Sequence, residues 1–429
     1  MGGEPVIAII YERGAVSPAE IAVGLAGLGT RVFAVPKSGS EHVRRVRPLL
    51  AQLGDVVELT GDPVADADQL RSRAPTAILT FSESQLRTTA RLASALGLSF
   101  HDEATTRLLT DKFLQRQRLR EAGVDEVRSF LIRSMEDWSA ASAETRLPAV
   151  VKPVQGEGGR NTVMIGSDAE AAELLPEMLS ADSASSDDEP VLVVEELLLG
   201  RPTSGIVGDY VSVESVCSPW GISHLAVTGK FPLVPPFRET GVFWPAPLPP
   251  EEQEEILELT TRALLALGVG LGLTHTEIKI TPSGPRIIEV NGRIGGHVNL
   301  LARHACGVDL VRLAGLLALG ERVDIPSLRS RKVHFLRNVL APTEPCEFIG
   351  VYGDGDVRAI PDVDGYRPYV RKGDRLPGGV MTQFLDLLWG TCNNLVELSA
   401  VLEEATAALS YEFMFDTGPC RVRAAELLG

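Results

Sequence analysis

The sequence has no long hydrophobic run. No apolar stretch among its 429 residues reaches the roughly 18 residues that a membrane-spanning helix needs. The opening residues, MGGEPVIAIIYERG, carry an acidic residue where a secretory signal peptide has basic ones. We therefore expect a cytoplasmic protein with no membrane partner.

Cysteine and positive charge are also scarce. The five cysteines are scattered, odd in number and without a C-x-x-C pair, which is typical of reduced, mostly structural thiols. Lysine and arginine total 41 against 57 acidic residues, a formal net charge of −16. Because a phosphate backbone favours an excess of basic residues, this balance argues against a nucleic-acid partner.

The length of the sequence predicts about three domains, and its 44% hydrophobic content is typical of globular ones. The first hundred residues alternate short β-rich runs (PVIAII, RVFAVP, VVELT, TAILTF) with helical ones, the pattern of a parallel βαβ sheet. The glycines of GLAGLG (24–29) lie at a helix end, so we interpret them as helix packing and a C-cap rather than a dinucleotide fingerprint.

Three further segments of the chain have a predicted structure. One helix is expected from about 104 to 122, and the acidic Ser/Ala run 181–189 predicts a loop. The last hundred residues hold several short strands and a final helix, which predicts a separate appended lobe.

Two β-rich runs, THTEIKIT and PRIIEVNGR, are separated by the turn signal Pro-Ser-Gly-Pro and predict a hairpin. Alternate residues of a strand share a face, so Glu277 and Lys279 would lie beside Glu289 and Asn291, with Ile288 and Val290 pointing into the core. Two carboxylates and an amide oxygen are ligands that suit Mg²⁺, which usually shares its remaining sites with nucleotide phosphates.

The glycine-rich segment QGEGGRN (155–161) is the candidate phosphate-binding element. It is not a Walker loop, but its glycines would let backbone N–H groups fold over phosphates, with Lys152 and Lys112 supplying positive charge. We find no nucleophilic triad in the sequence.

Simpler interpretations stand beside these. Glu277 with Lys279 is also the pattern of a solvated strand face, and Arg293 of a surface ion pair. His297 after two glycines is more often a turn or cap residue than a ligand, and His304 with Cys306 favours helix packing over a zinc pair. Trp244 suits a core position as well as a substrate wall.

The order of these elements resembles the ATP-grasp superfamily, and within it the L-amino acid ligases that join two amino acids or peptides. The resemblance covers about 5–320 and rests on TDKFLQRQRLREAGV, PAVVKPVQGEGG, VLVVEELLLG and HTEIKITPSGPRIIEVNGRIGGH. It implies an α/β multidomain chain with α+β parts: an ATP-grasp fold with an N-terminal Rossmann-like parallel βαβ domain and an appended C-terminal α+β lobe. The implied domains are 1–105, 106–190 with the phosphate loop, 191–330 with the metal and substrate site, and 331–429.

The resemblance also implies roles for single residues. ATP would be bound by Lys112, Lys152, the closing loop Gly156, Glu157, Gly158, Gly159 and Arg160, and the hinge Glu195, Glu196, Leu197 and Leu198, the hinge largely through its backbone. Two Mg²⁺ ions, with Mn²⁺ as an alternative, would be held by Glu277, Glu289 and Asn291. Arg293 and Lys279 would be the catalytic cations, with Arg293 stabilising the acyl-phosphate. Substrate would be bound by Glu214, Glu239, Trp244, Gly295, Gly296 and His297.

The sequence departs from the family pattern after the hinge. Many members have a Gly-x-Glu there, whose acid binds ribose, whereas this chain has Gly200-Arg-Pro-Thr. The resemblance therefore assigns no ribose-binding residue.

The implied activity is that of an ATP-dependent carboxylate–amine ligase acting on small-molecule amino acids or peptides, in dipeptide or antibiotic-type natural-product biosynthesis, with a homodimer among the assemblies to test. A purine-pathway or biotin-carboxylase-like enzyme is the alternative reading, although the aromatic, Pro-rich segment 230–250 better suits walls around amino-acid side chains than a bicarbonate site. A non-catalytic nucleotide-binding regulator is a third, and the intact set of Glu277, Glu289, Asn291 and Arg293 weighs against it.

Overall fold

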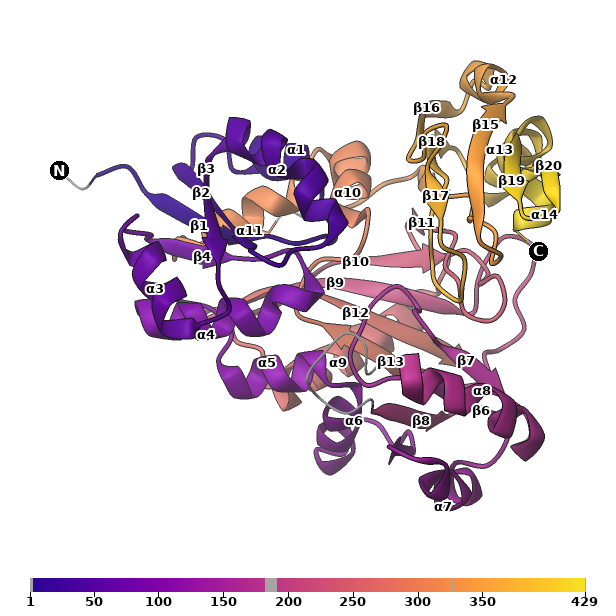
Figure 1. Cartoon of the computed structure of the whole chain (residues 1–429), viewed down its shortest axis with the longest axis horizontal. Helices are drawn as coiled ribbons and strands as arrows, with labels where there is room; N and C mark the ends of the chain where they lie inside the picture. The colour runs from indigo at the N-terminus through magenta and orange to yellow at the C-terminus, as the bar shows by residue number, and fades with distance from the viewer. Residues whose placement is uncertain (1–2, 182–190, 326–327, 429) are drawn as a thin grey trace.

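A computed structural model describes residues 3–181, 191–325 and 328–428 (Figure 1). The loop predicted over 181–189 lies outside these residues from position 182 on. Figure 1 shows three masses: an indigo N-terminal domain, a magenta subdomain below it, and an orange and yellow C-terminal lobe.

The N-terminal domain is a four-stranded parallel sheet with helices on both faces, as the alternation predicted. Ile7 and Ile9 of the first strand face one hydrophobic cluster, and Ala8 and Ile10 face another. The strands, in the spatial order β3-β2-β1-β4, are β1 (Val6–Ile10), β2 (Thr30–Pro36), β3 (Asp55–Leu59) and β4 (Ala77–Leu79). The helices are α1 (Pro18–Gly24), α2 (Glu41–Leu53), α3 (Pro63–Arg71), the 3-10 turn η1 (Glu83–Gln85) and α4 (Leu86–Leu96).

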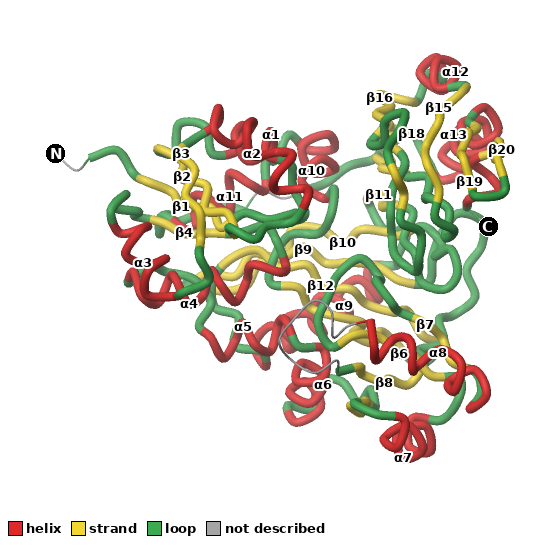
Figure 2. Tube along the Cα trace, viewed as in Figure 1, coloured by secondary structure: helices red, strands yellow, loops and turns green. Residues whose placement is uncertain are grey.

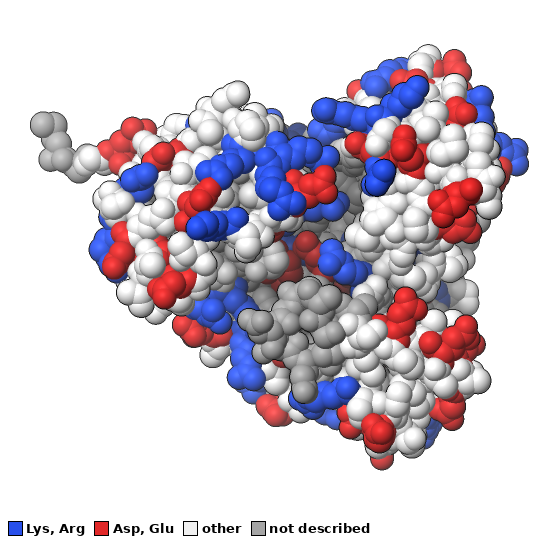
Figure 3. Space-filling model, viewed as in Figure 1, with Lys and Arg blue, Asp and Glu red and all other residues white. Residues whose placement is uncertain are grey.

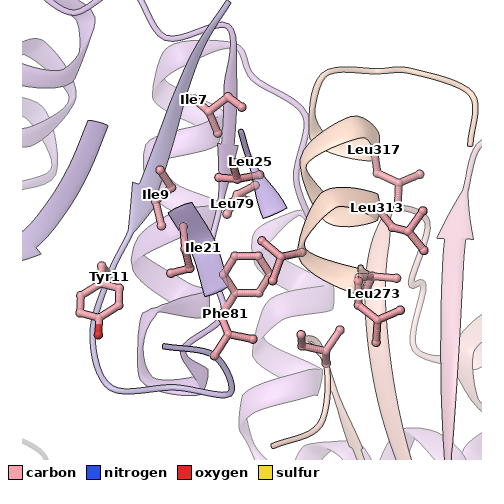
Figure 4. Packing of buried hydrophobic residues seen from close by; sticks show 14 of the residues in the cluster. Ile7, Ile9, Tyr11, Ile21, Leu25, Leu79, Phe81, Leu273, Leu313 and Leu317 are labelled. Carbon is pink, nitrogen blue, oxygen red and sulfur yellow. The ribbon is translucent and has the colours of Figure 1, made fainter. Parts of the chain in front are cut away.

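The N-terminal sheet packs against an element from much later in the chain. Figure 4 shows side chains of the sheet and α1 facing Leu313 and Leu317 of α11 (Leu310–Ala318) and Leu273 of β12 (Gly272–Thr281). Gly24 permits the close approach, since a Cβ there would lie 2.6 Å from the side chain of Val311. The glycine is therefore used for helix packing, as predicted.

The prediction of a single helix from about 104 to 122 is wrong. The structure has two helices, α5 (Glu103–Thr110) and α6 (Lys112–Glu121), separated by Asp111 in an extended conformation. The carboxylate of Asp111 accepts a hydrogen bond from Leu114 N (3.0 Å), which makes it the N-cap of the second helix. The break puts Lys112 at the start of α6, with its backbone N–H donating to Val154 O (3.0 Å).

The next subdomain carries the glycine-rich loop. Its four-stranded antiparallel sheet has the order β5-β8-β6-β7. The elements are β5 (Ser129–Ile132), α7 (Met135–Thr145), β6 (Ala149–Pro153), β7 (Val163–Ile165), α8 (Asp168–Ala181) and β8 (Leu192–Glu196). Strands β6 and β7 pair only between 149–151 and 163–165, so most of the glycine-rich loop lies outside the sheet.

A large antiparallel sheet forms the centre of the molecule, and the C-terminal lobe extends it (Figure 2). Its eight strands run in the order β13-β12-β9-β10-β11-β14-β18-β16. Besides β12, they are β9 (Tyr210–Ser218), β10 (Gly221–Lys230), β11 (Gly241–Trp244), β13 (Gly284–Asn291), β14 (Val333–Arg337), β16 (Val363–Pro368) and β18 (Asp386–Cys392). Helix α9 (Pro250–Ala266) packs on one part of this sheet and α10 (Val298–Cys306) on another.

The last hundred residues form the predicted additional lobe, but it is not separate from the rest. Its strand β14 pairs with β11, so three of its strands belong to the central sheet. The remaining elements are β15 (Cys346–Tyr352), α12 (Asp354–Ala359), β17 (Arg375–Leu376), α13 (Leu395–Ala408), β19 (Ser410–Phe415), β20 (Gly418–Arg423) and α14 (Ala424–Leu427). The pairing fixes the lobe beside the strands that carry the charged residues.

The predicted hairpin is confirmed as β12 and β13, with one correction. Glu277 lies directly opposite Glu289, and His275 lies opposite Asn291. A β-bulge next to Glu277 shifts the register, so the buried hydrophobic residues of β13 are Ile287 and Val290, while Ile288 is only half-buried. An inserted residue reverses the alternation on one side of a bulge, which a strict two-residue period does not anticipate.

Two other expectations concern the whole chain. All five cysteines are unpaired, as predicted. Over 3–181, 191–325 and 328–428, the helices are all too short or too polar to span a bilayer.

Candidate active site

Figure 3 shows a hollow between the three masses, with acidic and basic side chains on its walls. The β12–β13 hairpin brings the carboxylates of Glu277 and Glu289 opposite each other, where like charges would repel without counter-ions. Lys112 Nζ lies 3.0 Å from Glu289 Oε1, and Lys230 Nζ lies 3.5 Å from Glu277 Oε1. Each acid therefore has a cation from a different element.

Glu277 is held in its ionised form. Burial raises its pKa, but Lys230 and His275, whose Nε2 lies 3.2 Å from Glu277 Oε1, outweigh burial and keep the pKa far below the usual range. Burial also opposes a charge on His275, yet Glu214 and Glu277 on either side of the ring raise its pKa to about 9. The imidazole is accordingly protonated at neutral pH.

Arg293, just after β13, connects three parts of the chain. Its guanidinium Nε lies 3.1 Å from Glu83 Oε2 of the N-terminal domain, and Nη2 lies 3.6 Å from Glu157 Oε2 of the glycine-rich loop. The contact with Glu83 is an ion pair without hydrogen-bond alignment. Burial is the main cause that raises the pKa of Glu83, to about 7.

Lys152 belongs to a buried ion cluster. Its Nζ lies 2.8 Å from Glu195 Oε2, and Arg116 reaches the same carboxylate with two N–H groups at 3.0 and 3.1 Å. Burial would raise the pKa of Glu195, but the two cations lower it to about 2. The cluster fixes Lys152 at the end of β6.

The glycine-rich loop lies over this region. Lys112 Nζ donates to Gly156 O at 2.7 Å, so the same lysine contacts the loop and Glu289. Gly156, Gly158 and Gly159 have φ values of 138°, 67° and 65°, in the region that favours glycine. These conformations explain why the loop requires glycine.

Beyond Glu277, several elements contribute a group of polar side chains. Lys230 Nζ also lies 3.0 Å from Glu239 Oε1, whose second neighbour is the Tyr210 hydroxyl at 3.4 Å. His297, with a φ of 63°, contacts the C-terminal lobe: its Nε2 lies 3.0 Å from the Tyr369 hydroxyl. Burial lowers the pKa of His297 to about 4, so this ring is neutral.

The donor set fits Mg²⁺ shared with phosphate. The described part of the chain contains no group of three or more His, Cys, Asp and Glu side chains able to hold a metal by themselves. Glu277, Glu289 and Asn291 offer oxygen ligands only, and one or two carboxylates are the usual protein share for Mg²⁺ bound with nucleotide phosphates. The arrangement suits a metal–nucleotide pair rather than a metal held by protein alone.

Comparison with solved structures decides the fold. The L-amino acid ligase from Bacillus licheniformis superposes with a TM-score of 0.79 over 96% of this chain and 99% of that one, at 20% identity. The biotin carboxylase domain of Hydrogenobacter thermophilus 2-oxoglutarate carboxylase, solved with MgADP and bicarbonate, superposes with a TM-score of 0.70 over 98% of this chain and 92% of that one, at 16% identity. This chain has the ATP-grasp fold. Of these two structures the L-amino acid ligase has the higher TM-score, and both confirm the fold class expected from the sequence.

Curated proteins are more similar to this chain in sequence than these structures, but over a shorter part of it. It is 29% identical to the uncharacterized protein y4rH of Sinorhizobium fredii over 294 residues, 68% of this chain and 58% of that one. It is 27% identical to alanine–anticapsin ligase of Bacillus subtilis over 302 residues, 67% of this chain and 60% of that one. The chain thus spans less than two thirds of the length of these relatives. No family model matches it.

Several of the residues predicted from the sequence lie close together in the structure. The structure brings together the metal-ligand candidates Glu277, Glu289 and Asn291, with Arg293 and Lys112 among them. Arg160, in the loop, is exposed. Gly295 is required sterically, since a Cβ there would lie 2.4 Å from His275 Nδ1, whereas a Cβ at Gly296 would meet nothing within 4 Å.

The structure corrects four of the predicted positions. Lys279 does not join the carboxylates: its Nζ lies 2.7 Å from Asp209 Oδ2. Trp244 is 6% exposed and packs in a hydrophobic cluster with Leu301, so it belongs to the core. Glu195 has strand partners on both sides of β8, and Glu196 has one on one side. Of the predicted hinge, Leu197 and Leu198 lie beyond the end of the strand.

Glu214 is also placed differently from its prediction. It is buried at 2% exposure, and its carboxylate contacts His275 Nδ1 and accepts a hydrogen bond from Gly295 N at 3.3 Å. Its carboxylate is therefore engaged by His275 and the Gly295 backbone and is not exposed to a substrate.

Sequence reasoning missed several residues of the site, namely Glu83, Arg116, Tyr210, Lys230, His275, Tyr369 and Phe384. Glu83 follows β4 of a parallel sheet, and the carboxyl end of such strands is where ligands bind, so its position was a usable signal. His275 precedes Glu277 by two residues on the same strand face and was also within reach of the pattern. Tyr369 and Phe384 had no such signal.

Proposed function

We propose that this protein is an ATP-dependent ligase that joins the carboxylate of one amino acid to the amino group of a second amino acid or a peptide. The observation that carries the proposal is the pair Glu277 and Glu289 with Arg293 beside it, beneath a glycine-rich loop. Alanine–anticapsin ligase and the L-amino acid ligase carry this function in their names, and the likeness to them favours natural-product synthesis.

The first chemical step would be transfer of the γ-phosphoryl group of ATP to a substrate carboxylate. A carboxylate oxygen forms the new P–O bond, the bond to ADP breaks, and ADP leaves with the electron pair. Such transfer depends mainly on positioning and on neutralising charge. Lys112, Lys152 and Arg293 supply positive charge at the phosphates, and Mg²⁺ held by Glu277, Glu289 and Asn291 would supply more when bound.

The second step would be attack of an amine nitrogen on the acyl carbon. The C–O bond to phosphate breaks, phosphate leaves, and the nitrogen loses a proton as the amide forms. Arg293 would stabilise the negative oxygen of the tetrahedral state. The glycine-rich loop would exclude water, which otherwise hydrolyses the acyl-phosphate.

The test is purified protein with ATP, Mg²⁺ and a panel of amino-acid pairs, with ADP assayed and products identified by mass spectrometry. We expect ADP and an amide product only when an accepted acid and amine are both present. Glu289→Gln should lower turnover by at least about 100-fold while the far-UV circular dichroism stays unchanged, because one metal oxygen loses its charge. Glu252→Gln, which removes a surface ion pair with Arg201, is the control and should retain activity.

Two outcomes would contradict the proposal. Full turnover by Glu289→Gln would remove the metal assignment. ADP release that requires bicarbonate and no amine would instead support the carboxylase-like alternative.

A further inference from the structure

A short segment of the C-terminal lobe touches both halves of the active site. We call residues 378–384, between β17 and β18, the bridging strip. It is anchored to the chain just after β14: Gly379 N donates to Thr343 O, and Ala341 N donates to Gln383 O, each at 2.8 Å. An isolated β-bridge joins Leu340 and Phe384. The strip is thus fixed to the extended central sheet.

One side of the bridging strip holds the glycine-rich loop. Thr382 N donates to Gly158 O at 2.9 Å, and Asn161 N donates to Val380 O at 2.9 Å. Because β6 and β7 pair over three residues each, the loop's own sheet does not fix these positions. The two hydrogen bonds hold the loop against a lobe that lies more than two hundred residues later in the chain.

The other side of the strip reaches Glu239 and His297, which would bind the amino acid in the proposed ligase, and we call these two residues with Lys230 the amino-acid pocket. The Thr382 hydroxyl accepts a hydrogen bond from Glu239 N at 3.2 Å, and the carboxylate of Glu239 lies 3.0 Å from Lys230 Nζ. The Phe384 ring lies 5.4 Å from the ring of His297. A single residue, Thr382, therefore bonds to the loop through its backbone and to the pocket through its side chain.

We propose that Thr382 is a positioning residue that couples closure of the glycine-rich loop to the amino-acid pocket. The proposal rests on the proposed ligase function and assigns a part of that function to the C-terminal lobe. When the pocket is organised around Glu239, the strip presents the Thr382 N–H and the Val380 carbonyl where the closed loop needs them. A loop released from the strip would admit water, and the acyl-phosphate would be lost to hydrolysis.

Thr382→Val tests this coupling, because valine matches threonine in shape and keeps the backbone N–H but has no hydroxyl for Glu239 N. In the wild type we expect one ADP for each amide formed, and in Thr382→Val a clear excess of ADP over amide. Thr382→Ser keeps the hydroxyl and should restore the ratio to one. A reduced rate with an unchanged ratio in Thr382→Val would overturn the proposal, since a merely structural role predicts that result.

A second measurement does not depend on turnover. Hydrogen exchange of the 156–162 amides is followed in wild type and Thr382→Val with Mg²⁺ and a non-hydrolysable ATP analogue. Loss of one hydrogen bond should speed exchange in this loop by about fivefold, while exchange in the N-terminal sheet stays the same. Equal exchange in both proteins would refute the coupling even if the ligase assay succeeds. If instead no amino-acid pair gives product with the wild type, the ligase proposal fails. The hydrogen-exchange measurement still decides whether Thr382 holds the loop.

Discussion

The buried ion cluster around Glu195 allows one prediction to be worked out in energy. Glu195→Gln removes the negative charge shared by Arg116 and Lys152, all three being less than 10% exposed in their side chains. The two cations lower the pKa of Glu195 from 4.5 to about 2, against the effect of burial. That difference of about 2.5 units corresponds to about 3 kcal/mol at about 1.36 kcal/mol per unit. Removing one partner of a buried ion pair lowers the free energy of unfolding by about 3–5 kcal/mol, which is the same range.

The pH dependence has a definite sign. A carboxyl group whose pKa is depressed by folding stabilises the protein above its unfolded pKa, and this contribution is lost as the pH falls toward the folded value. The stabilisation by Glu195 is therefore complete at pH 7 and declines between about pH 4.5 and 2. Glu195→Gln removes this contribution, so its deficit against the wild type should shrink as the pH falls.

Urea unfolding at pH 7 measures the loss directly. We expect Glu195→Gln to lower the free energy of unfolding by about 3 kcal/mol, and to raise the KM for ATP because Lys152 loses its anchor. Glu196→Gln is the matched control: it removes the neighbouring, more exposed pair with Arg128 and a looser one with Arg286 at 3.9 Å, and should cost less than about 1 kcal/mol. A loss below about 1 kcal/mol for Glu195→Gln would refute the reasoning, since the cluster would then contribute no more than a surface pair.

Two further predictions test packing around the site. Gly295→Ala should destabilise the protein by about 1–3 kcal/mol, since the new Cβ would lie 2.4 Å from His275 Nδ1, whereas Gly296→Ala, with open space, should be nearly neutral in the same urea titration. Burial lowers the pKa of His101 to about 4, so the folded protein resists its protonation and loses up to about 3 kcal/mol as the pH falls from 6.5 to 4. His101→Leu should abolish that part of the pH dependence, and parallel unfolding profiles for the two proteins would contradict the burial argument.

The local pattern of the sequence was sufficient for the elements whose hydrophobic period is regular. The alternation of β-rich and helical runs predicted the parallel N-terminal sheet, and the two-residue period placed Glu277 and Glu289 on one face of a hairpin. These features depend on neighbours within a few residues, where backbone geometry dictates which side chains share a face. The likeness to ATP-grasp ligases was recognisable from the same stretches.

The tertiary structure decided everything that depends on a partner distant in sequence. By the two-residue alternation Lys279 shares a strand face with Glu277, yet its ammonium group pairs with Asp209 instead of the site carboxylates. Trp244 is a residue type that suits a substrate pocket, but the pairing of β11 with β14 buries it in the core. Glu83 and Thr382 reach the site from opposite ends of the chain, the first through Arg293 and the second through Gly158. A sequence pattern reports which face a side chain takes, whereas the partner on that face is set by how separate sheets pack and extend one another.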